Sequence, residues 1–170
     1  LMHRAEVRAT DAPFRLLVRL GVWDEDENIL LLRLGVPTSF SPEVLEEAAH
    51  AAHEVIEREA GRVDQRRDLT ALHTMSIDSE LTQDIDDAVS CEVADGLILL
   101  GVHIADPASV IRPDMLLDRE ACDRATSLYF PEGKIPMLPP LLSEGALSLV
   151  AGEVRPAMSL MVTLTPEGEI

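Results

Sequence analysis

The sequence predicts an α+β fold, with helices in the first third of the chain and antiparallel strands after them. The sequence Ser41-Pro42-Glu43 is typical of a helix start. Asp95-Gly96, between two apolar runs, predicts a hairpin turn. Hydrophobic residues make up 46% of the 170 residues, enough for a real core. Because aromatic residues are only 3%, aliphatic side chains must fill that core.

Residues 1–65 are expected to form a helical N-terminal region. Apolar residues at helical spacing predict one helix over residues 13–20, capped by Thr10 or Asp11 and stopped by Gly21. A second short helix is expected over residues 26–34. Two interpretations remain open: a winged-helix or helix-turn-helix remnant, and a helical cap packed on the main domain.

A longer connecting helix should begin at Ser41, run to about Ala60 and end at Gly61. His50 and His53 lie on it three residues apart. Without a third ligand at a recognised spacing, we interpret them as part of a solvated face.

Residues 66–170 change to a strand pattern. Runs 88–94 and 97–105 flank the Asp95-Gly96 turn, so paired residues should have numbers that sum to 191. Ala88 then faces His103, and Asp106 returns alongside the acidic segment before residue 88.

The remaining pattern mixes short elements. We expect a turn with a helical piece over residues 107–113, and a helix over 119–126 capped by Asp118. The proline-rich run 134–140 excludes a regular helix or central strand. A short helix capped by Ser143 and a strand over 157–164 should follow, and the final turn at 166–168 suggests a piece of a longer protein.

The chemistry concentrates in residues 74–88. Five carboxylates fall within ten residues, and no Lys or Arg occurs between Arg67 and Arg112, a window with nine acids. Carboxylates beside apolar strands repel one another and cost free energy to desolvate. A cation is the natural missing partner, so the segment predicts a divalent-metal site. Aspartates suit Mg²⁺, and two ions could activate a water and stabilise the leaving oxygen of a phosphodiester.

Three alternatives fit less well. An EF-hand counted from Asp78 would need Gly where Gln83 stands and Glu where Val89 stands. Zinc is disfavoured because the segment lacks Cys and His. A solvated acidic turn is the usual default, but neighbouring Ile77 and Ile85 tie the segment to buried strands.

Charge and cysteine content limit the function classes. A net charge of −17 argues against a passive nucleic-acid-coating surface, although not against an enzyme that holds phosphates through metal ions. Cys91 and Cys122 make neither a disulfide framework nor a metal-ligand spacing. With no membrane-span or signal-peptide pattern, we expect a soluble, cytoplasmic protein without a membrane partner.

Several ordered blocks resemble the catalytic domain of the ribonuclease II / ribonuclease R (RNB) family. The resemblance covers about residues 66–165, and residues 37–49 resemble the segment that precedes that domain. It is carried by blocks with the following sequences: Ile77-Asp78, Asp84-Ile-Asp86-Asp87-Ala88, Gly101-Val-His-Ile-Ala-Asp106, Leu117-Asp-Arg-Glu-Ala121, Arg124-Ala-Thr-Ser-Leu-Tyr129-Phe-Pro131, Ile135-Pro-Met-Leu-Pro139, Leu142-Ser143, Ser148-Leu149 and Arg155-Pro156-Ala157.

The resemblance implies a partial RNB catalytic domain of a processive, metal-dependent exoribonuclease. Such an enzyme hydrolyses single-stranded RNA from its 3′ end and releases nucleoside 5′-monophosphates, using Mg²⁺ (one or two ions, with Mn²⁺ as a substitute). Asp78 and Asp87 would be metal ligands, with Asp84 supporting them. Asp86 would be the catalytic residue most critical for the chemical step, and Tyr129 would stack near the RNA 3′ end.

The sequence also departs from the family pattern. Pro107 and Ala146 replace residues common in relatives, and we interpret both as packing changes. The family's catalytic arginine, the rest of the catalytic domain and a C-terminal S1-type RNA-binding domain would lie beyond Ile170. N-terminal cold-shock barrels are not evident. The alternative function is a catalytically inactive RNA-binding or adaptor member, and the four intact aspartates favour the enzyme.

Overall fold

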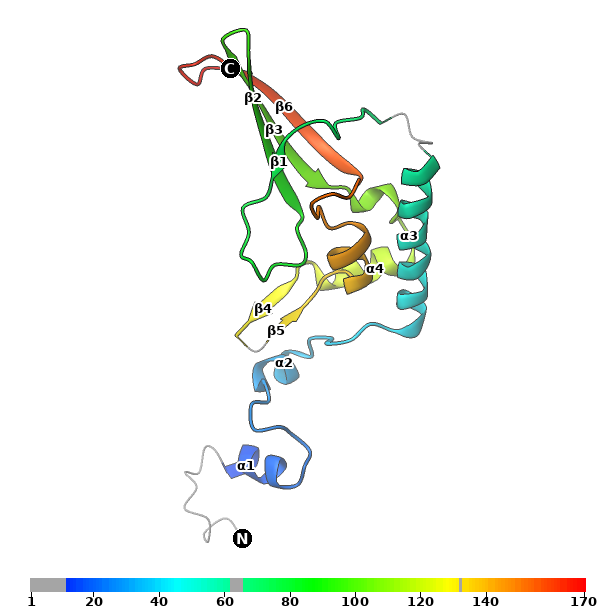
Figure 1. Ribbon diagram of the computed structural model, residues 1–170. Helices are drawn as coiled ribbons and strands as arrows, with labels where there is room; N and C mark the ends of the chain where they lie inside the picture. The colour runs from blue at the N-terminus through cyan, green and yellow to red at the C-terminus, as the bar shows by residue number, and fades with distance from the viewer. Residues whose placement is uncertain (1–11, 62–65, 132) are drawn as a thin grey trace. The chain divides into compact units, whose positions relative to one another are not determined.

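The computed structural model describes residues 12–61, 66–131 and 133–170 (Figure 1). It confirms the predicted α+β class. The chain divides into two compact units, residues 1–38 and 39–170. The helix over residues 42–61 therefore belongs to the second unit, while the predicted division between residues 65 and 66 remains a prediction.

Two short helices make up the described part of the first unit. Helix α1 (Ala12–Arg19) matches the predicted helix, and its proposed caps Thr10 and Asp11 lie outside the described residues. Helix α2 (Ile29–Leu34) begins three residues later than predicted, because the Asn28 side chain accepts a hydrogen bond from the Leu30 amide at 3.1 Å. Gly35, at φ 64°, ends it.

The second unit contains a four-stranded antiparallel sheet in the order β1-β2-β3-β6. Its strands are β1 (Thr74–Met75), β2 (Asp87–Ala94), β3 (Leu97–Ala105) and β6 (Ala157–Leu164). Asp95 and Gly96 turn the chain at φ 52° and 75°, as a two-residue hairpin requires. Ala88 pairs with His103 and Asp87 with Ile104, which confirms the predicted register.

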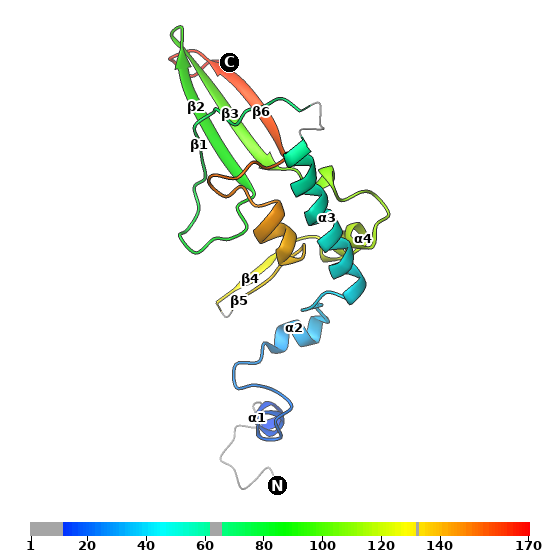
Figure 2. The ribbon, with the colours of Figure 1, turned by 45° about the vertical axis from the view of Figure 1, so that its right-hand side comes forward.

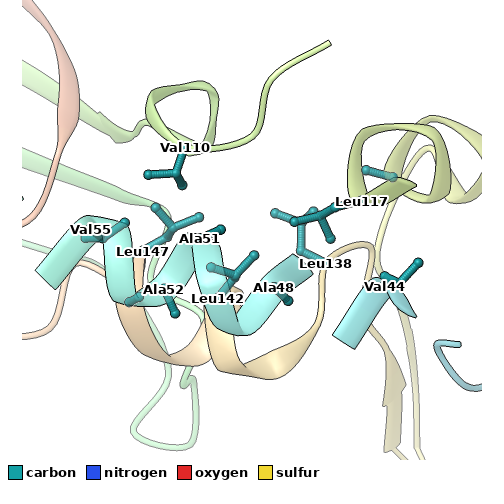
Figure 3. Packing of buried hydrophobic residues seen from close by; sticks show 12 residues of the cluster. Val44, Ala48, Ala51, Ala52, Val55, Val110, Leu117, Leu138, Leu142 and Leu147 are labelled. Carbon is teal, nitrogen blue, oxygen red and sulfur yellow. The ribbon is translucent and has the colours of Figure 1, made fainter. Parts of the chain in front are cut away.

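The core lies at one end of this sheet, where α3 (Pro42–Gly61) packs against η3 (Leu141–Ala146) and α4 (Leu116–Arg124) (Figures 1 and 2). The hydroxyl of Ser41 caps α3 as predicted, accepting a hydrogen bond from Val44 N at 3.3 Å. Figure 3 shows the apolar stripe of α3 beside side chains of η3 and its flanks. Among the described side chains of α3, the buried ones are Val44, Ala48, Ala51, Ala52 and Val55.

Two predicted helices are present, but their predicted starts were wrong. Helix α4 begins at Leu116 and not at Arg119, and the side chain that satisfies its first turn comes from α3: Glu47 Oε2 accepts from Leu117 N at 2.9 Å. Ser143 lies inside the π-helix η3 and does not cap it. The Leu147 amide donates to the Leu142 carbonyl at 2.9 Å, the wide spacing of a π-helix.

A second, two-stranded sheet pairs β4 (Leu128–Phe130) with β5 (Gly133–Ile135), and a 3₁₀ turn, η2 (Pro107–Ser109), follows β3. Arg124 links α4 to the segment before α3 and to the residue after β5. Its nearly buried guanidinium bonds to Glu120 at 2.8 Å, donates to the carbonyls of Ser39 and Pro136, and lies 3.9 Å from the centre of the Phe40 ring.

Every helix in the described part of the chain is too short or too polar to cross a bilayer.

Candidate active site

The acidic loop, residues 76–86, joins β1 to β2 and is fixed at its C-terminal end by Ser148. The Ser148 hydroxyl donates to the Gln83 carbonyl at 2.7 Å and accepts from the Ile85 amide at 3.0 Å. The Leu149 amide donates to the Ile85 carbonyl at 2.8 Å. Since Ser148 is only 1% exposed, these bonds are shielded from water.

Asp84 is the best-held carboxylate of this loop. Tyr129 Oη donates to Asp84 Oδ2 at 2.7 Å, and Lys134 Nζ lies 2.9 Å from Asp84 Oδ1. Desolvation alone would raise the pKa of Asp84, but the hydrogen bonds from Tyr129 and Lys134 outweigh it and lower the pKa below 3.8. Asp84 is therefore held as a carboxylate with both oxygens engaged.

The pKa values of Tyr129 and Lys134, the two partners of Asp84, are raised. The hydrogen bond to Asp84 raises the pKa of Tyr129 above 10.0, and nearby Asp86 adds to that increase. Burial tends to lower the pKa of Lys134, but its bonds to Glu144 and Asp84 raise it above 10.5. At neutral pH the site therefore holds a neutral Tyr129 phenol, a Lys134 ammonium and an Asp84 carboxylate.

The other predicted site residues are open to solvent. Asp78, Asp86 and Asp87 are exposed, and within the described part of the chain their carboxylates make no hydrogen bond or ion pair. No three His, Cys, Asp or Glu side chains of the described residues gather to hold a metal ion. The donors still suit Mg²⁺ chemically, because this ion uses one or two protein carboxylates and completes its shell with water and phosphate.

Two residues expected near the acidic loop have structural partners instead. The Asp106 carboxylate turns to Arg66, with 2.6 Å between Oδ2 and Nη2. His103 is buried between two hydroxyls, with Nε2 2.9 Å from Ser90 Oγ and Nδ1 2.8 Å from Ser159 Oγ. In these contacts both side chains stabilise the sheet and its flanking segment.

Sequence reasoning missed Lys134, Glu144 and Ser148 as parts of the site. Lys134 is the only lysine in the chain, and this was the one feature of the sequence that could have drawn attention to it. It lies outside the acidic window, so a local count of charges could not bring it to Asp84.

A cleft of about 1310 Å³ opens on the face of the sheet that carries His103. It is bordered by residues 66–76 and 149–157, including Arg66 and Arg155. None of the predicted site aspartates lines it, and neither does Tyr129. Ile85 and Ala88 do line the cleft, so it reaches the backbone beside the aspartates without including their side chains.

The sequence of the second unit agrees with a known domain. Residues 66–170, which contain all four aspartates and Tyr129, match the RNB domain. The chain belongs to the RNB domain family. This confirms the resemblance drawn from the motif blocks.

Individual RNB proteins extend the comparison. An uncharacterised ribonuclease of Synechocystis is 42% identical over 95% of this chain, which spans 24% of that protein. Mycoplasma genitalium RNase R, solved with ribose-methylated single-stranded RNA, matches 90% of this chain and 22% of its own length, with a TM-score of 0.73 and 24% identity. Yeast Ssd1, a pseudonuclease, matches 65% of this chain and 14% of its own, with a TM-score of 0.57 and 27% identity. The chain thus spans a quarter or less of the length of each of these proteins.

Proposed function

We propose that this RNB chain forms part of a metal-dependent 3′-to-5′ exoribonuclease that hydrolyses single-stranded RNA to nucleoside 5′-monophosphates. One observation carries the proposal: all four family aspartates occur in order within the matched region, and three of them, Asp78, Asp86 and Asp87, are exposed to solvent. A bound Mg²⁺ would supply electrophilic stabilisation of the phosphodiester and a more acidic water. Asp78 and Asp87 would hold it, with Asp84 in support.

The residues of this chain would contribute in different ways. Asp86 is exposed one residue before β2, and it is the carboxylate on which we place the chemical step. Tyr129 is 67% exposed while its hydroxyl is fixed by Asp84, so its ring has a set direction and free surface on which a base can stack. The chain charge of −17 favours phosphate contacts that are made through bound metal ions.

The test is release of labelled nucleoside 5′-monophosphates from uniformly labelled single-stranded RNA by the full-length protein with Mg²⁺. Asp86→Asn should abolish release and leave the fold unchanged. Asp95→Asn is the matched control, because it makes the same chemical change on an exposed residue at the far end of the β2–β3 hairpin, and it should retain wild-type activity.

A second candidate is an inactive RNA-binding member of the family, favoured by the fold shared with the yeast pseudonuclease. The same assay separates the two. Wild-type protein that binds RNA but releases no nucleotide, with or without Asp86→Asn, would overturn the exoribonuclease proposal and support the inactive member.

A further inference from the structure

The only lysine of the chain lies between two carboxylates from distant segments. Lys134 Nζ is 2.9 Å from Asp84 Oδ1 in the acidic loop and 2.7 Å from Glu144 Oε1 in η3. The side chains of Lys134, Asp84 and Glu144 are 22%, 14% and 23% exposed. This shielding makes the contacts stronger than those of a fully exposed surface pair.

Lys134 and Tyr129 act on Asp84 together. The two residues are direct partners across the β4–β5 pair, and each one takes a different oxygen of the same carboxylate. Two donors on two oxygens fix the carboxylate in rotation as well as in position, which one hydrogen bond cannot do. The bond to Glu144 fixes the ammonium group itself.

The contact with Lys134 also compensates the negative charge of Asp84. Asp84 is partly removed from water and has no basic neighbour in its own part of the sequence. An ionised carboxylate in that position needs a charged partner to offset its desolvation. Lys134 supplies the partner from another sheet.

We propose that Lys134 is a positioning residue that orients Asp84, and through it Tyr129, by anchoring the acidic loop to η3. It touches neither RNA nor a reacting atom in this role. Its effect on RNA hydrolysis rests on the proposed function, whereas its effect on Asp84 and Tyr129 does not.

The chain offers a direct probe, because Tyr129 is its only tyrosine. Ring-¹³C tyrosine labelling gives a single Cζ signal, which reports the hydrogen bond from Tyr129 to Asp84 at neutral pH without metal or RNA. Asp84→Asn provides the reference for a weakened bond. We expect Lys134→Met to move the signal toward the Asp84→Asn position, and Lys134→Arg to return it toward wild type.

The matched control is Arg119→Met, which removes the same charge from a largely exposed pair with Asp114. It should leave the Tyr129 signal at the wild-type position. A wild-type signal in Lys134→Met would overturn the proposal, and so would an equal displacement in Arg119→Met.

A second measurement needs no substitution and therefore no assumption about folding. In chain labelled with ¹⁵N-lysine, one ammonium signal should persist at neutral pH, since Asp84 and Glu144 protect its protons from exchange with water. Rapid exchange that removes this signal would show Lys134 to be free in solvent and would overturn the proposal.

The hydrolysis assay then tests whether the positioning of Asp84 by Lys134 affects RNA hydrolysis. In an active full-length protein, Lys134→Met should lower nucleotide release by about 10-fold to 100-fold, the range for residues that orient a ligand from outside. Unchanged release in Lys134→Met would overturn its role in the reaction. If wild-type protein releases nothing, the proposed function fails, while the two NMR measurements still decide the role of Lys134.

Discussion

Tyr129 Oη donates a 2.7 Å hydrogen bond to Asp84 Oδ2, which joins the β4–β5 sheet to the acidic loop. Two sequence features that were interpreted separately, an RNA-stacking tyrosine and a supporting aspartate, are therefore one unit. A change in the charge of either residue should be felt by the other.

The first prediction concerns the ionisation of Tyr129. Because Asp84 accepts a hydrogen bond from the Tyr129 hydroxyl, the pKa of Tyr129 should be above 10.0 in the folded chain. It should fall back toward that value in Asp84→Asn. Phenolate absorbance measures it directly, since the chain has no other tyrosine. The control, Asp95→Asn, should titrate like the wild type, and an identical titration of Asp84→Asn and wild type would contradict the prediction.

The sign of the accompanying stability change follows from linkage. A group whose pKa is raised by folding holds its proton more tightly in the native state than in the unfolded state. Its contribution is complete below the unfolded value of 10.0 and is lost as pH rises through the folded pKa. Asp84 acts in the opposite sense: its lowered pKa contributes stability above 3.8 that is lost as pH falls. Urea unfolding across both pH ranges measures these contributions.

The second prediction concerns Ser148. Ser148→Ala removes the bonds to Gln83 and Ile85 and leaves the Ile85 amide without the hydroxyl that it donates to. The free energy of unfolding should fall by about 1–3 kcal/mol in urea denaturation, the cost of an unsatisfied buried group. Ser76→Ala, on an exposed loop residue, should change it by less than about 0.5 kcal/mol. Equal effects of the two substitutions would refute the assigned role of Ser148.

The third prediction concerns the close approach at Gly101. A Cβ at this position would lie 2.7 Å from His103 Nε2 and would also collide with the Ser90 hydroxyl. Gly101→Ala should therefore break the Ser90–His103 bond and cost about 1–3 kcal/mol of stability. Gly145→Ala is the matched control, because the nearest atom to its new Cβ is the Pro140 carbonyl oxygen at 3.8 Å. Thermal unfolding compares the two, and a fully stable Gly101→Ala would contradict the packing described for His103.

The sheet was predictable because its signals are local. Asp95-Gly96 accepts positive φ, and a two-residue turn at that point sets the register of the strands on either side, so the pairing of β2 with β3 followed from a short-range rule. The fold class and the strand β6 followed from the same kind of pattern.

The details that sequence reasoning missed depend on partners far along the chain. The start of α4 is set by Glu47 of α3, and the charge of Asp84 is balanced by Lys134 of β5. The deficit of basic residues around the acidic loop led to the prediction of a divalent metal ion, which remains a prediction. For Asp84 the structure supplies an ammonium group, which a search for neighbours in sequence could not identify. The metal assignments of Asp78, Asp84 and Asp87, and the catalytic role of Asp86, remain predictions.

The fourth prediction tests the core that supports this arrangement. Leu142 is 0% exposed in η3 and packs in the cluster with α3, whereas its neighbour Leu141 is 53% exposed (Figure 3). Leu142→Ala should lower the free energy of unfolding by about 2–5 kcal/mol, through lost burial and the cavity that remains. Leu141→Ala removes the same atoms from a site open to solvent and should cost less than about 1 kcal/mol. Because η3 also carries Glu144, Leu142→Ala should speed exchange of the Lys134 ammonium protons, while Leu141→Ala should not. Similar unfolding free energies for the two variants would show that η3 is not packed on α3 as described.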